Sequence, residues 1–242
     1  MAFPNIVFGS DGDQYVTGTT QTADVSTKLV LADGRAFRYA LAGAVALVAG
    51  DVIQAPVPVT NHVLQTLSVA AVAGDKSVAV VLGATAATAD QYKDGYLAIE
   101  LGTGFGYTYQ IATHAAVASA GTFTVPLRAT VQVAIPTTAN TVSLISNAYR
   151  SVIQAPITTL TGAVVGVAVK PAAISAYSWL QTHGPGTVTT IGTVVIGANA
   201  VSPTGTAAGA CGPSGASTST NIGRVMHVAT TTNKSLIDLA ID

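Results

Sequence analysis

The chain is a succession of short segments rich in β-branched residues, each ended by a turn-forming residue, and this pattern restricts the possible folds most. Val, Ile and Thr fill these segments, and branched side chains favour extended backbone. Pairs such as Asp33-Gly34, Gly74-Asp75 and Asp94-Gly95 supply turns between them. We expect strands at 78–82, 96–101, 123–125, 130–135, 141–145, 163–169 and 236–241. The sequence therefore predicts an all-β fold, a compact β-barrel or sandwich with very little helix.

One of these segments, residues 130–135, alternates with the two-residue period of a strand. Val131, Val133 and Ile135 should share one face of it, while the residues between them share the other. We therefore expect 130–135 to be a strand.

An internal echo bears on the domain organisation. Val-Ile-Gln-Ala-Pro at 52–56 recurs at 152–156. Chance in a chain rich in Val, Ala and Pro is one explanation. The other is that the segment between the copies is a self-contained insert whose two ends meet in space. On that interpretation a discontinuous β base domain covers 28–60 and 151–242, and an inserted β domain covers 61–150.

Two segments lack the periodicity of packed structure. Residues 1–27 are polar and rich in Thr, and we expect them to form an extended N-terminal arm that lies on a partner. Gly and Ser crowd residues 203–215, which we interpret as a long surface loop or mobile arm.

Charge is unusually scarce. Asp, Glu, Lys and Arg make up 9% of the chain, against roughly 25% in an ordinary soluble domain. The net charge of −1 offers no basic face for nucleic acid, so no nucleic-acid partner is expected. No membrane partner is expected either, because the longest apolar run, 39–50, is shorter than the roughly 20 residues of a spanning helix. A neutral, apolar surface is typical of a protein covered by neighbouring subunits.

Cys211 is the only cysteine, which leaves no intrachain disulfide to stabilise the fold. The first residues show no basic stretch followed by an apolar one, so we expect no secretory signal. We therefore expect synthesis in a cytoplasm, with stability supplied by the core and by contacts.

Residues that could perform chemistry are few and scattered. The chain has four histidines and one glutamate, Glu100, and no pair of them has the spacing of metal ligands. Asp11-Gly-Asp13 begins like a calcium loop but lacks the later ligands, so a solvated turn is preferred. The segment 102–106 is rich in glycine but lacks phosphate-binding spacing, and we interpret it as a strand connection. We expect no enzyme activity and no catalytic, cofactor or metal site.

Aromatic residues are the best candidates for contacts. Tyr177 and Trp179 lie two residues apart, as do Tyr107 and Tyr109, so each pair should share one strand face. An exposed pair would suggest a binding site, sugar included. We favour a role as core or subunit-interface anchors, because small residues otherwise dominate the chain.

Several short motifs resemble the capsid decoration, or cement, proteins of tailed bacteriophages, especially those of marine phages. The motifs lie at 33–40, 46–51, 74–78, 90–99, 102–104, 166–168, 177–185 and 222–224. Together they spread over about residues 30–242.

The resemblance implies a non-enzymatic virion protein on the outer surface of an icosahedral head. Members of the family form trimers, bind the major capsid protein and hold neighbouring capsomers together. Their β fold often uses an N-terminal arm to reach the capsid, so residues 1–27 or 203–215 are expected to contact it. The alternative from the same composition is a receptor- or glycan-binding appendage of a head fibre or tail. That alternative would need exposed aromatics around Tyr107, Tyr109 or Trp179.

Overall fold

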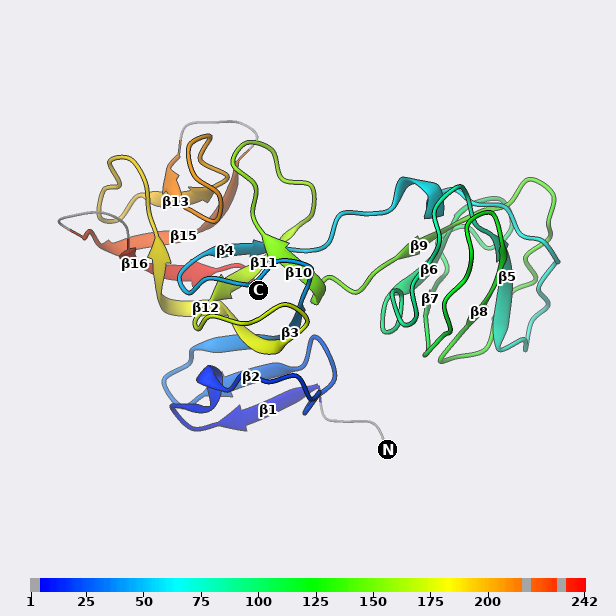
Figure 1. Ribbon diagram of the computed structural model, residues 1–242, viewed down its shortest axis with the longest axis horizontal. Coiled ribbons are helices and arrows are strands. Elements are labelled where there is room, and N and C mark those ends of the chain that lie inside the picture. The colour runs from blue at the N-terminus through cyan, green and yellow to red at the C-terminus, as the bar shows by residue number, and fades with distance from the viewer. Residues whose placement is uncertain (1–4, 215–218, 230–233) are drawn as a thin grey trace. The chain divides into compact units, whose positions relative to one another are not determined.

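A computed structural model describes residues 5–214, 219–229 and 234–242. This described part is all-β, as predicted: it forms sixteen strands and two 3₁₀ turns, η1 (Asp13–Tyr15) and η2 (Thr60–His62) (Figure 1). The chain divides into two compact units. Unit 1 comprises Met1–Pro56 and Ala148–Asp242, and unit 2 comprises Val57–Asn147.

The two copies of the Val-Ile-Gln-Ala-Pro echo lie on strands that flank unit 2 in the sequence. β4 (Val52–Gln54) and β10 (Arg150–Gln154) pair antiparallel, with Gln54 opposite Ile153. The chain therefore leaves and re-enters unit 1 on neighbouring strands. The observed boundaries, after Pro56 and before Ala148, lie a few residues from the expected ones at 60/61 and 150/151.

Unit 1 is built on one strongly bent sheet. Its strand order is β1-β2-β3-β10-β4-β11-β12-β16-β15-β13-β14, and β3 also pairs with β12. Figure 1 shows β1 at one edge and β13 near the other. The remaining strands are β1 (Ile6–Gly9), β2 (Lys28–Leu31), β3 (Ala36–Ala42), β11 (Val164–Ala168), β12 (Tyr177–Thr189), β13 (Asn199–Ser202), β14 (Gly212–Pro213), β15 (Thr220–His227) and β16 (Lys234–Ala240).

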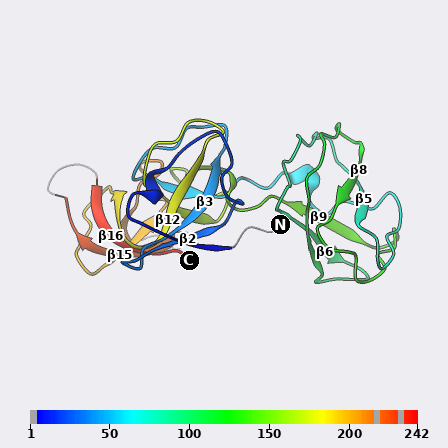
Figure 2. The same cartoon turned by 90° about the horizontal axis from the view of Figure 1, so that it is seen from below.

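The long strand β12 organises unit 1. Its first half pairs with β3 and its second half with β16, and a register shift between Gln181 and His183 lets it change partner. β12 lies beside β3 in Figure 2. Apolar side chains cover both halves of the bent sheet, and Leu180 and Val188 are buried in two different clusters. The bend therefore gives one sheet several small cores, each built mainly from Ala, Val and Leu.

The segment expected as an extended N-terminal arm, residues 1–27, packs against its own unit in the described part of the chain. Residues 1–4 lie outside the described part, and from Asn5 onward the segment 5–27 is bonded to unit 1. β1 pairs parallel with β2, and Gly18 exchanges backbone hydrogen bonds with Tyr177 at 3.1 and 2.7 Å. The hydroxyl of Tyr39 accepts a hydrogen bond from the backbone N–H of Thr22 at 3.1 Å. Backbone pairing and a buried tyrosine thus hold a segment that carries no apolar periodicity.

The loop expected at 203–215 is also packed, up to Pro213. Gly209 accepts a hydrogen bond from the backbone of Val52 and donates one to Ala155, both at 2.8 Å. Ala210 and Cys211 are buried, and Cys211 joins a core cluster. Small residues are needed here because the loop runs directly against the sheet; Gly215 lies outside the described residues.

Unit 2 contains two small sheets around one core. One sheet pairs β5 (Ser77–Val81) with β8 (Thr122–Pro126), and the other has the order β7-β6-β9, formed by β6 (Tyr96–Leu101), β7 (Thr108–Gln110) and β9 (Thr141–Ile145). The core cluster lies wholly within 67–144.

Residues 130–135 do not form the expected strand, but the residues expected to share one face do point toward the core. Val131 and Ile135 are buried and Val133 is partly buried, whereas the residues between them are exposed. Only Ile135 forms a bridge, to Ala71. The backbones of Val131 and Ile135 bond to residues 71–75. Between them the backbone N–H of Gln132 donates to the Tyr109 hydroxyl at 3.1 Å, so the pairing is interrupted.

Candidate functional site: a pocket and two exposed apolar edges

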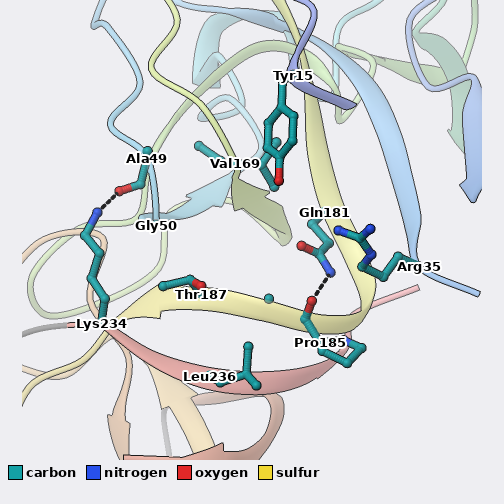
Figure 3. Close-up of a pocket in the computed structure, with 12 residues that line it drawn as sticks. Tyr15, Arg35, Ala49, Gly50, Val169, Gln181, Pro185, Thr187, Lys234 and Leu236 are labelled. Atoms are coloured by element: carbon teal, nitrogen blue, oxygen red, sulfur yellow. Dashed lines mark hydrogen bonds between the residues drawn. The ribbon is translucent and has the colours of Figure 1, made fainter. Parts of the chain in front are cut away.

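Unit 1 contains a pocket of about 360 Å³ against the kinked strand β12. Tyr15 of η1 forms one wall, Arg35 comes from the turn between β2 and β3, and Lys234 begins β16. Gln181 and Thr187 come from the two sides of the bend in β12. Figure 3 shows Lys234 at one end of the pocket and Arg35 beside Gln181 at the other. The bend in β12 makes the hollow, because the strand turns away before it joins β16.

Gln181 is 3% exposed and has one well-defined orientation. Its side-chain N–H groups donate to the backbone carbonyls of His183, Gly184 and Pro185, at 3.2, 3.3 and 2.9 Å. A carbonyl oxygen can bond only to the donor end of the Gln181 amide, which is Nε2. The acceptor end, Oε1, therefore points away from these three carbonyls. A Cβ at Gly186 would lie 2.9 Å from that oxygen. Gly186 thus leaves space in front of Oε1, and the oxygen faces the pocket (Figure 3).

The two cations of the pocket differ in electrostatic surroundings. Arg35 donates through Nη2 to Asp11 at 2.8 Å and through Nε to Asp33 at 2.6 Å. Hydrogen bonds from Gln14 and Arg35 lower the pKa of Asp11, and those from Arg35 lower the pKa of Asp33. Both carboxylates therefore stay ionised and compensate the guanidinium.

Lys234 is the uncompensated cation. Its ammonium group donates to the backbone carbonyl of Ala49, and no carboxylate of the described residues pairs with it. An ammonium has three donors, so this end of the pocket offers positive charge and further hydrogen bonds. Asp11, considered above as part of a possible calcium loop, pairs with Arg35 instead.

Tyr177 and Trp179, expected as anchors, pack within their own unit. The Tyr39 ring lies between them, stacked on Tyr177 with centroids 5.4 Å apart and tilted against Trp179 at 4.9 Å. Trp179 also packs against the small cluster that contains Phe37. The Tyr177 hydroxyl donates to Gln21 at 3.3 Å. These aromatics hold the N-terminal segment on the sheet.

Tyr107 and Tyr109 behave differently from one another. Their rings stack with centroids 6.3 Å apart, but Tyr109 is buried and Tyr107 is exposed. The loop before them displays Phe105, which is 72% exposed. Buried Asn140 fixes this loop by accepting from the Thr103 N–H and donating to the Thr103 carbonyl, at 3.3 and 2.7 Å. The result is an apolar tip on a well-held hairpin.

The second apolar edge is β1. This strand forms the end of the sheet, so one side of its backbone has no strand partner among the described residues. Ile6 is 51% exposed and Phe8 is 82% exposed, and Val7, on the opposite face, is also exposed. Edge strands with apolar side chains are able to take up a partner.

Unit 2 buries a group of polar aromatics that sequence spacing did not reveal. His62 Nε2 lies 2.8 Å from the Thr85 carbonyl, which assigns the ring hydrogen to Nε2. Nδ1 then accepts from the Tyr92 hydroxyl, and burial raises the pKa of Tyr92. His114 Nε2 accepts from the Tyr92 backbone N–H at 3.0 Å, and its Nδ1 donates to the Ala115 carbonyl at 2.9 Å. Every ring nitrogen has a partner, so the group is structural.

No group of three or more His, Cys, Asp or Glu residues that could hold a metal occurs in the described part of the chain. Among those same residues, no helix has the length and apolar character needed to cross a bilayer. Comparisons with protein-family models, with curated proteins and with solved structures found no match to this chain.

Proposed function

We propose that this chain is a non-enzymatic virion structural protein, a capsid decoration or cement protein. It binds the major capsid protein on the outer surface of an icosahedral phage head as a trimer and stabilises the shell. The sequence resemblance over about 30–242 suggests this role, and a weakly charged surface suits a protein surrounded by neighbours.

The observation that carries the proposal is the apolar edge of β1. Phe8 and Ile6 present apolar side chains beside a backbone edge that has no strand partner in the described part of the chain, which in a monomer would favour aggregation. Covering them against the shell removes apolar area from water, and backbone groups of β1 can pair with a strand of the capsid protein. The N-terminal segment is thus the proposed capsid contact, although from residue 5 it lies on its own unit.

Trimeric symmetry makes a small contact sufficient. One Phe8 side chain contributes roughly 1.5–3 kcal/mol when fully buried, which is too little to hold a protein on a shell. Three copies joined in one trimer bind together, and their combined affinity greatly exceeds that of one. Apolar contacts are also little screened by salt, so binding should persist between about 0.1 and about 0.5 M NaCl.

Co-sedimentation with undecorated heads tests the proposal. Wild-type protein should pellet with heads, and Phe8→Ser should bind at least about tenfold more weakly, because an exposed apolar anchor is lost. Phe105→Ser is the matched control, since it removes another largely exposed phenylalanine, one that belongs to unit 2. Deletion of 1–27 is a poor test, because it would also uncover Tyr39 and Tyr177.

Three outcomes separate the parts of this proposal. Failure of the wild-type chain to bind heads would reject the cement role. Undiminished binding of Phe8→Ser would reject β1 as the contact. A monomer in sedimentation equilibrium, both free and eluted from heads, would reject the trimer.

The alternative role as a glycan-binding appendage was expected to use Tyr107, Tyr109 or Trp179. Trp179 packs against Tyr39 and Tyr109 is buried, which leaves only Tyr107 of the three largely exposed. Tyr107 lies beside Phe105, which is also exposed, so the loop at 105–107 is the place where a glycan-binding role would be sought.

A further inference from the structure

We infer that the pocket beside Gln181 binds a single sugar residue that carries one carboxylate, a hexuronate. This site is separate from the proposed capsid edge on β1 and does not depend on the cement role. Its volume of about 360 Å³ lies in the range of small-molecule sites, about 300–1,000 Å³.

The first argument is the hydrogen-bond acceptor that Gln181 presents at one end of the pocket. Gln181 is nine-tenths buried, and three carbonyls fix its amide nitrogen. Its Oε1 accepts no hydrogen bond from the described residues and faces the hollow. A ligand hydroxyl would satisfy it, which favours a hydroxylated ligand over a purely apolar one.

The second argument is the distribution of further polar groups. Arg35 uses Nε and Nη2 for Asp33 and Asp11 and retains Nη1 hydrogens. Thr187 adds a hydroxyl that can donate or accept. These groups, together with Gln181, match alternating hydroxyl donors and acceptors. Tyr15 places its ring at the edge of the pocket with the hydroxyl end pointing inward, which adds a further donor or acceptor for a sugar hydroxyl (Figure 3).

The third argument concerns charge. Asp11 and Asp33 compensate Arg35, so that end gives hydrogen bonds without attracting an anion strongly. Lys234 has no ion-pair partner among the described residues, and the buried carboxylate of Asp51 is held by Thr189 and Gln154. One positive charge matches one carboxylate, whereas a phosphate or sulfate ester of higher charge would favour a second uncompensated cation.

Two small residues keep the ends of the pocket open. A Cβ at Gly50 would lie 3.0 Å from the Lys234 Nζ, and Gly50 has φ +87°, which disfavours any other residue. Gly186 clears the space in front of Gln181 Oε1 in the same way. The pocket is therefore open at the two atoms that would recognise the sugar.

The test is titration of the full-length protein with sodium glucuronate, glucose and sodium acetate, followed by two-dimensional NMR. Glucuronate should bind with a Kd of about 1 mM. Glucose should bind at least about tenfold more weakly, because it lacks the carboxylate for Lys234. Acetate should not saturate at about 20 mM, since it has no hydroxyls for Gln181. A linear glucuronate trisaccharide distinguishes a polymer site, which would bind it more tightly, from a site for the free sugar.

Lys234→Gln should weaken glucuronate binding about tenfold and leave glucose binding unchanged. Lys170→Gln is the matched control, because it removes an exposed lysine of the same unit outside the pocket. Equal affinity for glucose and glucuronate, equal behaviour of the two lysine variants, or no saturation by glucuronate at about 20 mM would each overturn the inference.

The head-binding assay separates this inference from the cement role. Lys234→Gln should bind undecorated heads as wild type does, and Phe8→Ser should bind glucuronate as wild type does. Loss of both activities in either variant would contradict two independent sites.

Discussion

The hydroxyl group of Tyr92 lies in the core of unit 2 and donates to Nδ1 of His62, whose other ring nitrogen is bound to a backbone carbonyl. We predict that Tyr92→Phe lowers the free energy of unfolding of unit 2 by about 1–3 kcal/mol, because Nδ1 is left buried without a donor. Urea unfolding followed by circular dichroism measures the change.

Tyr96→Phe is the control for this substitution. Tyr96 is exposed on β6, so removal of its hydroxyl should alter stability by less than about 0.5 kcal/mol. Equal effects of the two substitutions would show that the bond between Tyr92 and His62 contributes nothing net.

Residue-level prediction from sequence succeeded where neighbours in the chain were sufficient. The two-residue spacing placed Tyr177 and Trp179 on one face, and both do contact a shared ring. That ring is Tyr39, from another strand, and no local pattern could identify it. The same limit hid the contact between His62 and Tyr92, which are thirty residues apart.

At the scale of elements, one turn recurs in both units. A residue in an isolated β-bridge is followed three positions later by a residue with positive φ. The five bridge residues and their positive-φ partners are Leu47 with Gly50, Ala71 with Gly74, Ala87 with Asp90, Val117 with Ala120, and Ala172 with Ser175. Four of these turns lead directly into a strand, and the one at Asp90 is followed by a second turn before β6.

The recurring turn predicts a stabilising substitution. Ala120 has φ +55°, and an L side chain in this region costs about 1–2 kcal/mol. Glycine removes that strain but adds roughly 0.5–1 kcal/mol of conformational entropy cost. Ala120→Gly should therefore raise the free energy of unfolding by about 0.5–1 kcal/mol in urea titrations.

Ala118→Gly is the matched control, because Ala118 is exposed in the same turn and is not among the residues with positive φ. It should lower stability by about 0.5–1 kcal/mol. If both substitutions destabilise the chain, the positive φ of Ala120 carries no strain.

Element prediction was best where alternation and turns agreed. The expected strands 96–101 and 141–145 have the bounds of β6 and β9. In segment 130–135 the alternation correctly predicted which side chains are buried, but the segment is not a regular strand. Alternating hydrophobicity indicates burial and does not show which groups bond to the backbone. The segments 5–27 and 203–214 were misjudged because their order comes from backbone bonds to distant strands, which leave no periodic signal.

At the scale of the molecule, the pocket illustrates the same limit more strongly. Tyr15, Arg35, Gln181 and Lys234 meet only because β12 bends between β3 and β16. Their separation along the chain gave no motif. The two-unit organisation, by contrast, could be predicted from the repeated Val-Ile-Gln-Ala-Pro sequence. Its two copies lie on the strands where the chain leaves and re-enters unit 1.

The pairing of β4 with β10 leads to a prediction for the whole molecule. Residues 57–147 should be replaceable by about six Gly and Ser residues, because antiparallel neighbours can be joined by a short loop. Unit 1 should then fold alone, since its core clusters contain no residue of unit 2. The excised segment 57–147 should also fold, because its cluster lies within 67–144.

The reactivity of Cys211 shows whether unit 1 is folded, both in the full chain and in the shortened chain that lacks residues 57–147. Burial raises the pKa of its thiol to about 12, so little thiolate exists at pH 8, and the side chain is inaccessible. Alkylation by iodoacetamide should be at least about a thousandfold slower than in urea-unfolded protein, where the pKa returns to about 8.5. The shortened chain should give the same protection as the full chain. If the shortened chain is alkylated rapidly and the full chain is not, unit 1 needs unit 2 to fold. The two copies of Val-Ile-Gln-Ala-Pro would then lie on strands of one cooperative domain.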